Sequence, residues 1–308
     1  MISRRQFLRS ALVGSAAVGL GLGFRDLQAD GHTGDFILEK ITVPIAGLPS
    51  AFNGYSIGFL TDIHLSTWVP QIWIEHAIEA LKNQAVDLLV LGGDYILVQE
   101  LSLWNDWGIV RNTEFAKMPK REAIPKIYSS FAGLIAQHKF PDGILGVVGN
   151  HDHWNMYPLF ERIMRSHPTL QLLVNKEVSI RRKEQELCIF GVDDYLTGLP
   201  TAPPTRELPN GKAKRIIVSH NPDYLSALIH HPQHEFSLAL CGHTHGGQIV
   251  LPVLGPVAAQ VVDRRFVAGM QQVLDNRLVY TSRGLGVVGL PFRINCPAEV
   301  TVCRLEAA

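Results

Sequence analysis

The chain contains 308 residues, of which 46% are hydrophobic and 18% are charged, so it carries enough apolar material for a large domain with its own core. Its 28 basic residues are matched by 28 acidic ones, and this balance gives no electrostatic basis for nucleic-acid binding. We therefore expect one globular domain and no nucleic-acid partner.

The N-terminus has the pattern of an export signal. Two adjacent arginines, Arg4 and Arg5, precede an apolar stretch over residues 10–24 that contains four glycines. A twin arginine before a mildly apolar segment is typical of the Tat export signal. A transmembrane anchor is the weaker alternative, because a membrane span needs about 20 apolar residues.

We therefore predict a Tat signal over residues 1–29, cleaved after Ala29, and a functional domain over residues 30–308. The protein would use the Tat export machinery and reach a periplasmic or other extracytoplasmic location, with membrane association if the signal is retained. Cleavage removes four arginines and one aspartate from the 28 basic and 28 acidic residues, which leaves a net charge near −3.

The first third of the chain alternates strands and a helix. We predict strands over residues 36–45, 55–61 and 86–91, the last being a nearly unbroken apolar run, as expected for a strand covered on both faces. Pro70 marks a helix start, and an apolar stripe follows at helical spacing, made of Ile74, Ala77, Ile78 and Leu81.

Residues 95–125 interrupt this alternation. A long irregular segment in a compact domain is usually a lid or a binding loop. The alternative is a surface excursion whose own aromatic side chains form a small core. The residues that suggest either role are Trp104, Trp107, Arg111, Lys117, Lys120 and Arg121. A helix with Ile127, Phe131, Leu134 and Ile135 on one face is expected to follow Pro125.

The remainder of the chain is richer in strands, and pattern alone gives the fold class α/β. We expect a second sheet to begin at a hairpin over residues 177–182 and 187–192. The other predicted strands are 144–148, 215–219, 236–240, 248–251, 265–270, 278–281 and 300–305, with helices near 158–165 and 224–229.

Metal-ligating residue types follow five of these strands. In an extended segment, side chains two residues apart point the same way, so His243 and His245 bring two imidazoles to one point. Strand ends of an α/β sheet meet at the edge where such sheets place their sites. The motifs in chain order are Asp62-Ile63-His64, Gly93-Asp94, Gly149-Asn150-His151-Asp152, Ser219-His220 and Gly242-His243-Thr244-His245.

In this order the motifs resemble those of the calcineurin-like metallophosphoesterases, from about Asp62 to the C-terminus. The tail, with Ser282-Arg283-Gly284-Leu285-Gly286 and Cys296-Pro297-Ala298-Glu299-Val300, is similar to the exported bacterial branch of YkuE- and YaeI-type phosphodiesterases. The resemblance implies a four-layer α/β/β/α sandwich of two mixed sheets. It also implies a phosphoester hydrolase that depends on two divalent metal ions and acts on phosphodiesters.

The resemblance also assigns the site. It implies that Asp62, His64, Asp94 and His245 hold one metal, and that Asp94, Asn150, His220 and His243 hold the other. These ligand types suit Mn, Fe and Zn alike, so the metal stays open. His151 is expected to protonate the leaving oxygen. Leu97 occupies the position where many relatives carry an acid that orients this histidine, and Asp152 or Glu100 is the expected substitute.

Two alternatives to a phosphodiesterase remain open. One is a pyrophosphatase that acts on a nucleotide-linked lipid or cell-wall precursor. The other is a non-enzymatic scaffold that kept the fold, which the complete set of ligands disfavours. Arg283 could contact a substrate phosphate or form a structural salt bridge.

The apolar loop 284–292 also has two interpretations. It could be a buried connection, or it could form with Trp104 and Trp107 a wall for the acyl or prenyl chain of a lipid-linked substrate, with peripheral membrane contact. The four cysteines, Cys188, Cys241, Cys296 and Cys303, are expected to be buried thiols. His153 is nearest the site among the remaining histidines.

Overall fold

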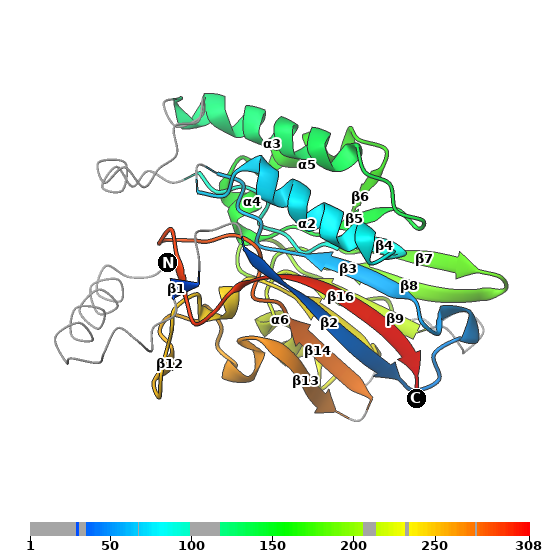
Figure 1. Cartoon of the computed structure of the whole chain (residues 1–308). Coiled ribbons are helices and arrows are strands. Elements are labelled where there is room, and N and C mark those ends of the chain that lie inside the picture. Colours follow the sequence, from blue (N-terminus) through cyan, green and yellow to red (C-terminus); the bar gives the residue numbers. More distant parts are fainter. Residues whose placement is uncertain are drawn as a thin grey trace.

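The computed structural model describes residues 29–30, 35–66, 68–98, 118–205, 214–231, 234–274 and 276–308. Two six-stranded sheets pack face to face and helices cover their outer faces (Figure 1). The predicted α/β/β/α sandwich is therefore confirmed. Most of the predicted signal and the middle of the predicted lid, with Glu100, Trp104, Trp107, Arg111 and Lys117, lie outside the described residues.

The first sheet contains the N-terminal strands and the last strand of the chain. Strands β3 to β6 run parallel, whereas β16 is antiparallel to β3 and parallel to β2. All four residues of β4 are buried, which accounts for their unbroken apolar run. The strand order is β2 (Phe36–Ile45), β16 (Ala298–Ala307), β3 (Ser56–Leu60), β4 (Leu88–Leu91), β5 (Ile144–Gly146) and β6 (Leu170–Leu172).

The second sheet begins at the predicted hairpin. Its strands β8, β9, β10 and β14 run parallel, and the antiparallel strands β7 and β13 form its edges. The strand order is β13 (Gly269–Leu274), β14 (Arg277–Thr281), β10 (Leu238–Cys241), β9 (Lys214–Ser219), β8 (Gln185–Gly191) and β7 (Lys176–Arg182).

Three apolar layers hold these elements together. Phe59, Leu88 and Leu240 belong to the core between the two sheets and are fully buried. A second core lies between the first sheet and the helices α2 (Gln71–Asn83), α3 (Lys120–Ala136) and α5 (Tyr157–Arg165). A third lies between the second sheet and α6 (Asp223–Leu228). All four cysteines are buried, as expected.

Short elements connect or flank the strands. They are the short helix α4 (Asn150–Trp154), the 3-10 turns η1 (Ser50–Phe52), η5 (His245–Gly247) and η6 (Arg264–Phe266), and two two-stranded sheets. One of these sheets pairs β1 (Ala29–Asp30) with β15 (Arg293–Ile294), and the other pairs β11 (Val250–Leu251) with β12 (Gly255–Pro256). Among the described residues, no helix combines the length and apolar character required to cross a membrane.

The structure corrects two predicted elements. Helix α3 begins at Lys120 and contains Pro125 as its sixth residue, although the pattern placed the helix after this proline; the helix continues through it without the hydrogen bond that a residue with an amide N–H would donate there. The strand predicted over 265–270 is instead the turn η6 followed by β13, because the Asp263 carboxylate accepts from the Arg265 amide (3.1 Å) and Gly269 takes a positive φ of 83°. Strand β6 and helix α4 were not predicted.

Candidate metal centre

All seven predicted metal ligands lie directly after strand ends at one edge of the two packed sheets. Asp62 and His64 follow β3, Asp94 follows β4, and Asn150 opens α4 after β5. His220 follows β9, and the pair His243 and His245 follows β10. Each of the seven is at most 3% exposed. Burial of this many polar side chains at one place is costly unless each finds a partner.

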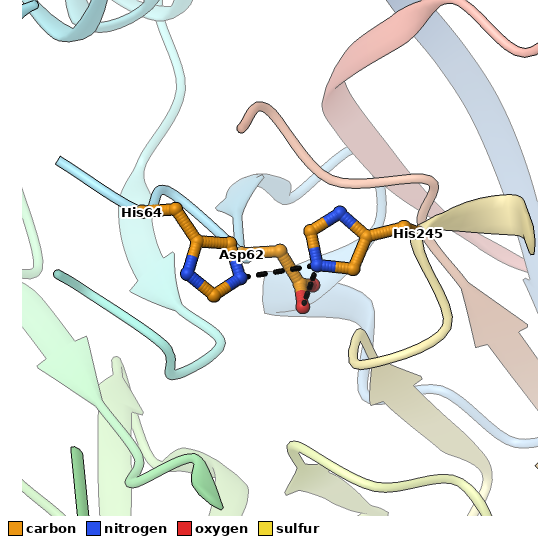
Figure 2. A group of neighbouring side chains, drawn as sticks. All are labelled: Asp62, His64 and His245. Carbon is orange, nitrogen blue, oxygen red and sulfur yellow. Dashed lines mark hydrogen bonds and ion pairs between the residues drawn. The ribbon is translucent and has the colours of Figure 1, made fainter. Parts of the chain in front are cut away.

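The first group of ligands consists of Asp62, His64 and His245 (Figure 2). The Nε2 atoms of His64 and His245 are 3.0 Å apart, and His245 Nε2 is 3.4 Å from Asp62 Oδ1. Two imidazole nitrogens and a carboxylate oxygen thus point at one another. Such a set matches the ligand chemistry of Mn, Fe and Zn.

Asp94 lies between this group and the remaining ligands. One of its oxygens, Oδ2, is 3.6 Å from His64 Nε2 and 3.2 Å from His220 Nε2. The other, Oδ1, accepts a hydrogen bond from the His151 amide at 2.8 Å. A carboxylate placed between two ligand groups has the position that a bridging ligand requires.

The second group, which comprises Asn150, His220 and His243, contains buried atoms that lack hydrogen-bond partners among the described residues. These atoms are Asn150 Oδ1, His220 Nε2 and His243 Nε2. A buried acceptor without a partner costs about 1–3 kcal/mol. The Nδ1 atom of His220 is 2.8 Å from the Gly92 carbonyl and donates to it, so the neutral form of His220 would offer Nε2 to a metal. A cation would satisfy these atoms, so the residues fit a second metal.

The backbone of the site is strained. Five of the seven ligands have positive φ, namely Asp62 (50°), His64 (50°), Asp94 (55°), His243 (71°) and His245 (52°). Asp and His tolerate this region better than most residues, but each instance still costs about 1–3 kcal/mol. Gly93 (φ 94°) permits the close approach, since a Cβ there would lie 2.9 Å from His220 Nδ1.

The local electrostatics favour ligation. Burial would raise the pKa of Asp94, but the nearby His220 and His151 hold it well below its usual value. Burial lowers the pKa of His243 to about 4 and holds the pKa values of His64 and His245 well below the usual value. Their lone pairs are therefore available at neutral pH.

His220 differs from the other three histidines. Burial acts to lower its pKa, but the Asp94 carboxylate overcomes this effect and raises it to about 10. Binding of a metal by His220 must therefore displace a proton.

His151, the predicted general acid, stands beside both groups. Its ring is 4.8 Å from the His64 ring and 4.9 Å from the Trp154 ring, edge-on in both cases. Its ligand-type nitrogen also groups with His64 and Asp94 within 4.8 Å. The indole of Trp154 is 61% exposed, so the contacts of His151 extend from the ligands to solvent.

Asp152 is buried beneath these residues. Its carboxylate accepts from the amides of Asp94 (2.9 Å), Gly149 (3.0 Å) and Tyr95 (3.1 Å). Burial and the charge of Asp94 raise its pKa to about 7. In the described part of the chain, no hydrogen bond joins Asp152 to the His151 ring. Its observed contacts join the loops that carry Asp94 and Asn150.

Three further residues support the site. Arg283 bonds Glu299 (2.7 Å) and Glu39 (3.3 Å), which is the structural alternative to a phosphate contact. His153 Nε2 is 2.8 Å from Asp193 Oδ1. Arg293, which the sequence did not indicate, is 3% exposed and donates to the carbonyls of Gly286 (2.6 Å) and His245 (3.1 Å). A lone arginine in the tail gives no sequence signal for such a position.

The apolar loop 284–292 is partly buried and partly exposed. Leu285 and Val287 are buried, and the Gly286 amide donates to the Asp62 carbonyl at 2.7 Å. The loop becomes partly exposed from Val288 onward, and Phe292 is 38% exposed. Its first half is therefore core beneath the ligand loop, and its second half forms surface beside it.

Comparison with known proteins agrees with this geometry. A family model described as calcineurin-like phosphoesterase matches residues 55–247, and one for the TAT (twin-arginine translocation) pathway signal sequence matches residues 1–21. The chain is 32% identical over 306 residues to phosphodiesterase YaeI of Escherichia coli (strain K12), covering 99% of this chain and 100% of that one.

Two further relatives are more distant. Metallophosphoesterase YkuE of Bacillus subtilis (strain 168) is 26% identical over 99% of this chain and 98% of its own length. A transmembrane protein with metallophosphoesterase domain from Danio rerio is 26% identical over 87% of this chain and 57% of its own length. The chain therefore belongs to the calcineurin-like phosphoesterase family and is a phosphoester hydrolase with an N-terminal Tat signal.

Proposed function

We propose that the protein is a dinuclear-metal phosphodiesterase that acts outside the cytoplasm on phosphodiesters with a lipid part. The observation that carries the proposal is the convergence of seven buried ligands from five strand ends, with Asp94 between two groups. One group contains atoms without partners, which a metal would satisfy. A scaffold without activity has no need of such atoms.

Asp62, His64, Asp94 and His245 would hold one cation, and Asp94, Asn150, His220 and His243 the other. Divalent cations bound there supply Lewis acidity that activates water and draws charge from the phosphoryl oxygens. The protein's own contribution is to fix the ligands: Gly92 orients His220, and the Asp62 carboxylate accepts from the His243 amide (2.9 Å). This preorganisation reduces movement during the reaction.

His151 would donate a proton to the leaving oxygen. Its position next to His64 and Asp94 supports this role, because a general acid must reach the phosphoryl group held by the ligands. The exposed Trp154 packs against it and would contact the leaving group. Asp152 would act on His151 by holding Gly149 and Asp94 in register, as a positioning residue.

The names of two relatives, an exposed apolar surface and the export signal support a diester with a lipid part. The relative YaeI is named a phosphodiesterase, and the relative from Danio rerio is named a transmembrane protein. The exposed half of loop 284–292 presents apolar side chains next to the ligand loop. An export signal would bring this surface to the outer face of a membrane.

The test combines metal analysis with a substrate panel. We expect the purified chain to hold two equivalents of Mn, Fe or Zn. We also expect it to hydrolyse a water-soluble diester, bis-p-nitrophenyl phosphate, much faster than the matching monoester. A chain without metal and without turnover would reject the enzyme, and faster cleavage of a nucleotide-linked pyrophosphate than of any diester would favour the pyrophosphatase.

A further inference from the structure

The β11–β12 hairpin ends in two exposed apolar side chains. Val253 is fully exposed, at 106% of its reference area, and Leu254 is 74% exposed. The tip is tight, because the Leu254 amide bonds the Pro252 carbonyl at 2.8 Å. Val253 has a φ of 68°, which is an outlier for a β-branched residue. A strained turn that holds two apolar side chains in solvent suggests a function for the tip.

The side chain of Gln248 joins the hairpin to the exposed half of loop 284–292. Gln248, which is 7% exposed, donates from Nε2 to the carbonyls of Leu290 (3.0 Å) and Phe292 (3.1 Å). Its Oε1 accepts from the Val288 amide at 2.9 Å. The two segments therefore form one unit, which we call the apolar platform and define as residues 250–256 and 288–294.

The apolar platform also adjoins the metal centre. Gln248 is three residues beyond His245, and the Arg293 guanidinium donates to the His245 carbonyl. On the other side, Gly286 bonds the loop that carries Asp62. Any partner that binds the apolar platform would therefore lie next to the two ligand groups.

The N-terminal segment joins the domain at the same place. Strand β1 pairs with β15, with Ala29 opposite Ile294 and Asp30 opposite Arg293. Ile294 in turn bridges to Ile249 at the base of the hairpin. The apolar part of the Tat signal, residues 10–24, ends five residues before β1. The segment that is directed to the membrane during export thus enters beside the platform.

We propose that the apolar platform docks on a lipid bilayer, with Val253, Leu254 and Phe292 inserted among the acyl chains. The bilayer is the expected occupant, rather than a second copy of the chain, because the membrane-directed segment enters beside the platform while the signal is still attached. Docking would hold the metal centre at the lipid surface, where a lipid phosphodiester presents its headgroup. This inference deepens the proposed function and rests on its extracytoplasmic location.

Site-specific fluorescence tests the insertion directly. The full-length, metal-loaded chain is labelled with the polarity-sensitive dye NBD at Val253→Cys, and a matched control carries the dye at Val262→Cys, where the native side chain is 89% exposed but lies outside the platform. All four native cysteines are buried, which favours selective labelling. The vesicles contain phosphatidylethanolamine and phosphatidylglycerol.

We expect the Val253 label to brighten about threefold on vesicles and to be quenched by doxyl groups on the acyl chains, whereas the Val262 label stays unchanged. Vesicle-bound protein with a silent Val253 label would overturn the proposal, because binding would then come from the N-terminal segment alone. Equal brightening of the two labels on vesicles would also overturn the proposal. So would brightening of the Val253 label without vesicles as the protein concentration rises, because the platform would then bind a second copy of the chain.

Turnover separates this proposal from the proposed function. Val253→Ser/Leu254→Ser is expected to slow hydrolysis of a phosphodiester lipid in vesicles about tenfold and to leave bis-p-nitrophenyl phosphate turnover unchanged. Val262→Ser serves as the matched control. Unchanged vesicle turnover in the double variant would reject docking even if the enzyme is active on the soluble diester. If the protein without substitutions does not hydrolyse bis-p-nitrophenyl phosphate, the proposed function would be rejected instead.

Discussion

The two ligand groups of the metal centre satisfy their atoms in different ways. In the first group, His64, His245 and Asp62 contact one another at 3.0 and 3.4 Å. In the second, Asn150 Oδ1, His220 Nε2 and His243 Nε2 have no hydrogen-bond partner among the described residues, although His220 pairs electrostatically with Asp94. The first group leaves one buried atom unpartnered among the described residues, His64 Nδ1, and the second leaves three, so the metal-free protein bears the larger cost in the second group. Asp94 connects the two.

Asp94→Asn should have the largest effect, because it removes the charge that both groups share. We expect kcat/KM to fall about 10³-fold, compared with about 10²-fold for His220→Ala, which affects the second group alone. The measurement is turnover of a soluble diester at saturating metal, with metal content by mass spectrometry. Equal losses in the two variants would contradict a bridging role for Asp94.

His151→Ala should come next. We expect about a 10²-fold loss on alkyl phosphodiesters and less than about threefold on nitrophenyl esters, because a good leaving group needs no proton in the transition state. Metal content should stay unchanged, since His151 is assigned to neither group. A uniform loss across leaving groups would reject general-acid catalysis and would indicate that His151 supports the ligands instead.

Metal removal tests the difference between the groups directly. Chelation should lower the free energy of unfolding by about 3 kcal/mol if metal was present at about 100 times its dissociation constant. In the metal-free state, Asn150→Ala should be less destabilising than in the metal-loaded state, because it removes a buried acceptor without a partner. Thermal unfolding of both proteins in both states gives this difference, and an identical effect in both states would show that Asn150 does not bind metal.

The exposed half of loop 284–292 should affect only lipid substrates. Val288→Ser/Leu290→Ser is expected to raise KM for a lipid phosphodiester about tenfold and to leave a soluble diester nearly unchanged, because only binding of the apolar tail is lost. Leu285→Ala, which alters the buried half, is the contrasting variant and should lower the melting temperature. Equal losses of the double variant on both substrates, with reduced melting temperature, would assign the whole loop to the core.

The smallest expected effect concerns the ion pair that holds α4, the helix that begins at Asn150. Burial acts to lower the pKa of His153, but Asp193 raises it, and the same contact lowers the pKa of Asp193 against the effect of burial. The stability from His153 is therefore fully present below its unfolded pKa of about 6.5 and is lost as pH rises through its folded pKa.

We expect His153→Gln to cost about 1 kcal/mol at pH 5.5 and less at pH 8.5, measured by denaturant unfolding. On the acid side, the cost should also decline as pH falls through the lowered pKa of Asp193. Asp193→Asn combined with His153→Gln should remove the pH dependence of the difference. A cost that does not change with pH would mean that the pair contributes packing and not charge.

Much of this molecule could be predicted from sequence. The apolar run of β4 and the motifs after five strands were sufficient to place the ligands on one edge, because parallel strands bring their carboxyl ends together. The structure then confirmed the sandwich. The pattern failed at η6, where a short polar cap and a glycine turn outweighed apolar alternation.

Other features depend on tertiary contacts that sequence patterns do not encode. Nothing near Arg293 distinguishes it from a surface arginine, and its burial is visible only once five carbonyl groups surround it. The exposure of Val253 is similarly hidden, because the predicted strand ends at residue 251 and an apolar residue beyond it carries no sign that it faces solvent. The unpartnered atoms of Asn150, His220 and His243 emerge only from the full set of neighbours.

The position of β16 has a consequence for how the chain acquires this structure. This strand lies between β2 and β3, with ten register pairs on one side from Phe36 to Ile45 and four on the other from Ser56 to Phe59. Those partners are separated from it by more than 200 residues in the chain. Until β16 is synthesised, both earlier strands keep unpaired edges, and contacts of such long range form slowly. The strand that delivers Asp62 and His64 can pair with β4 earlier, but its pairing with β16 forms only after the segments that carry all the other ligands have been synthesised.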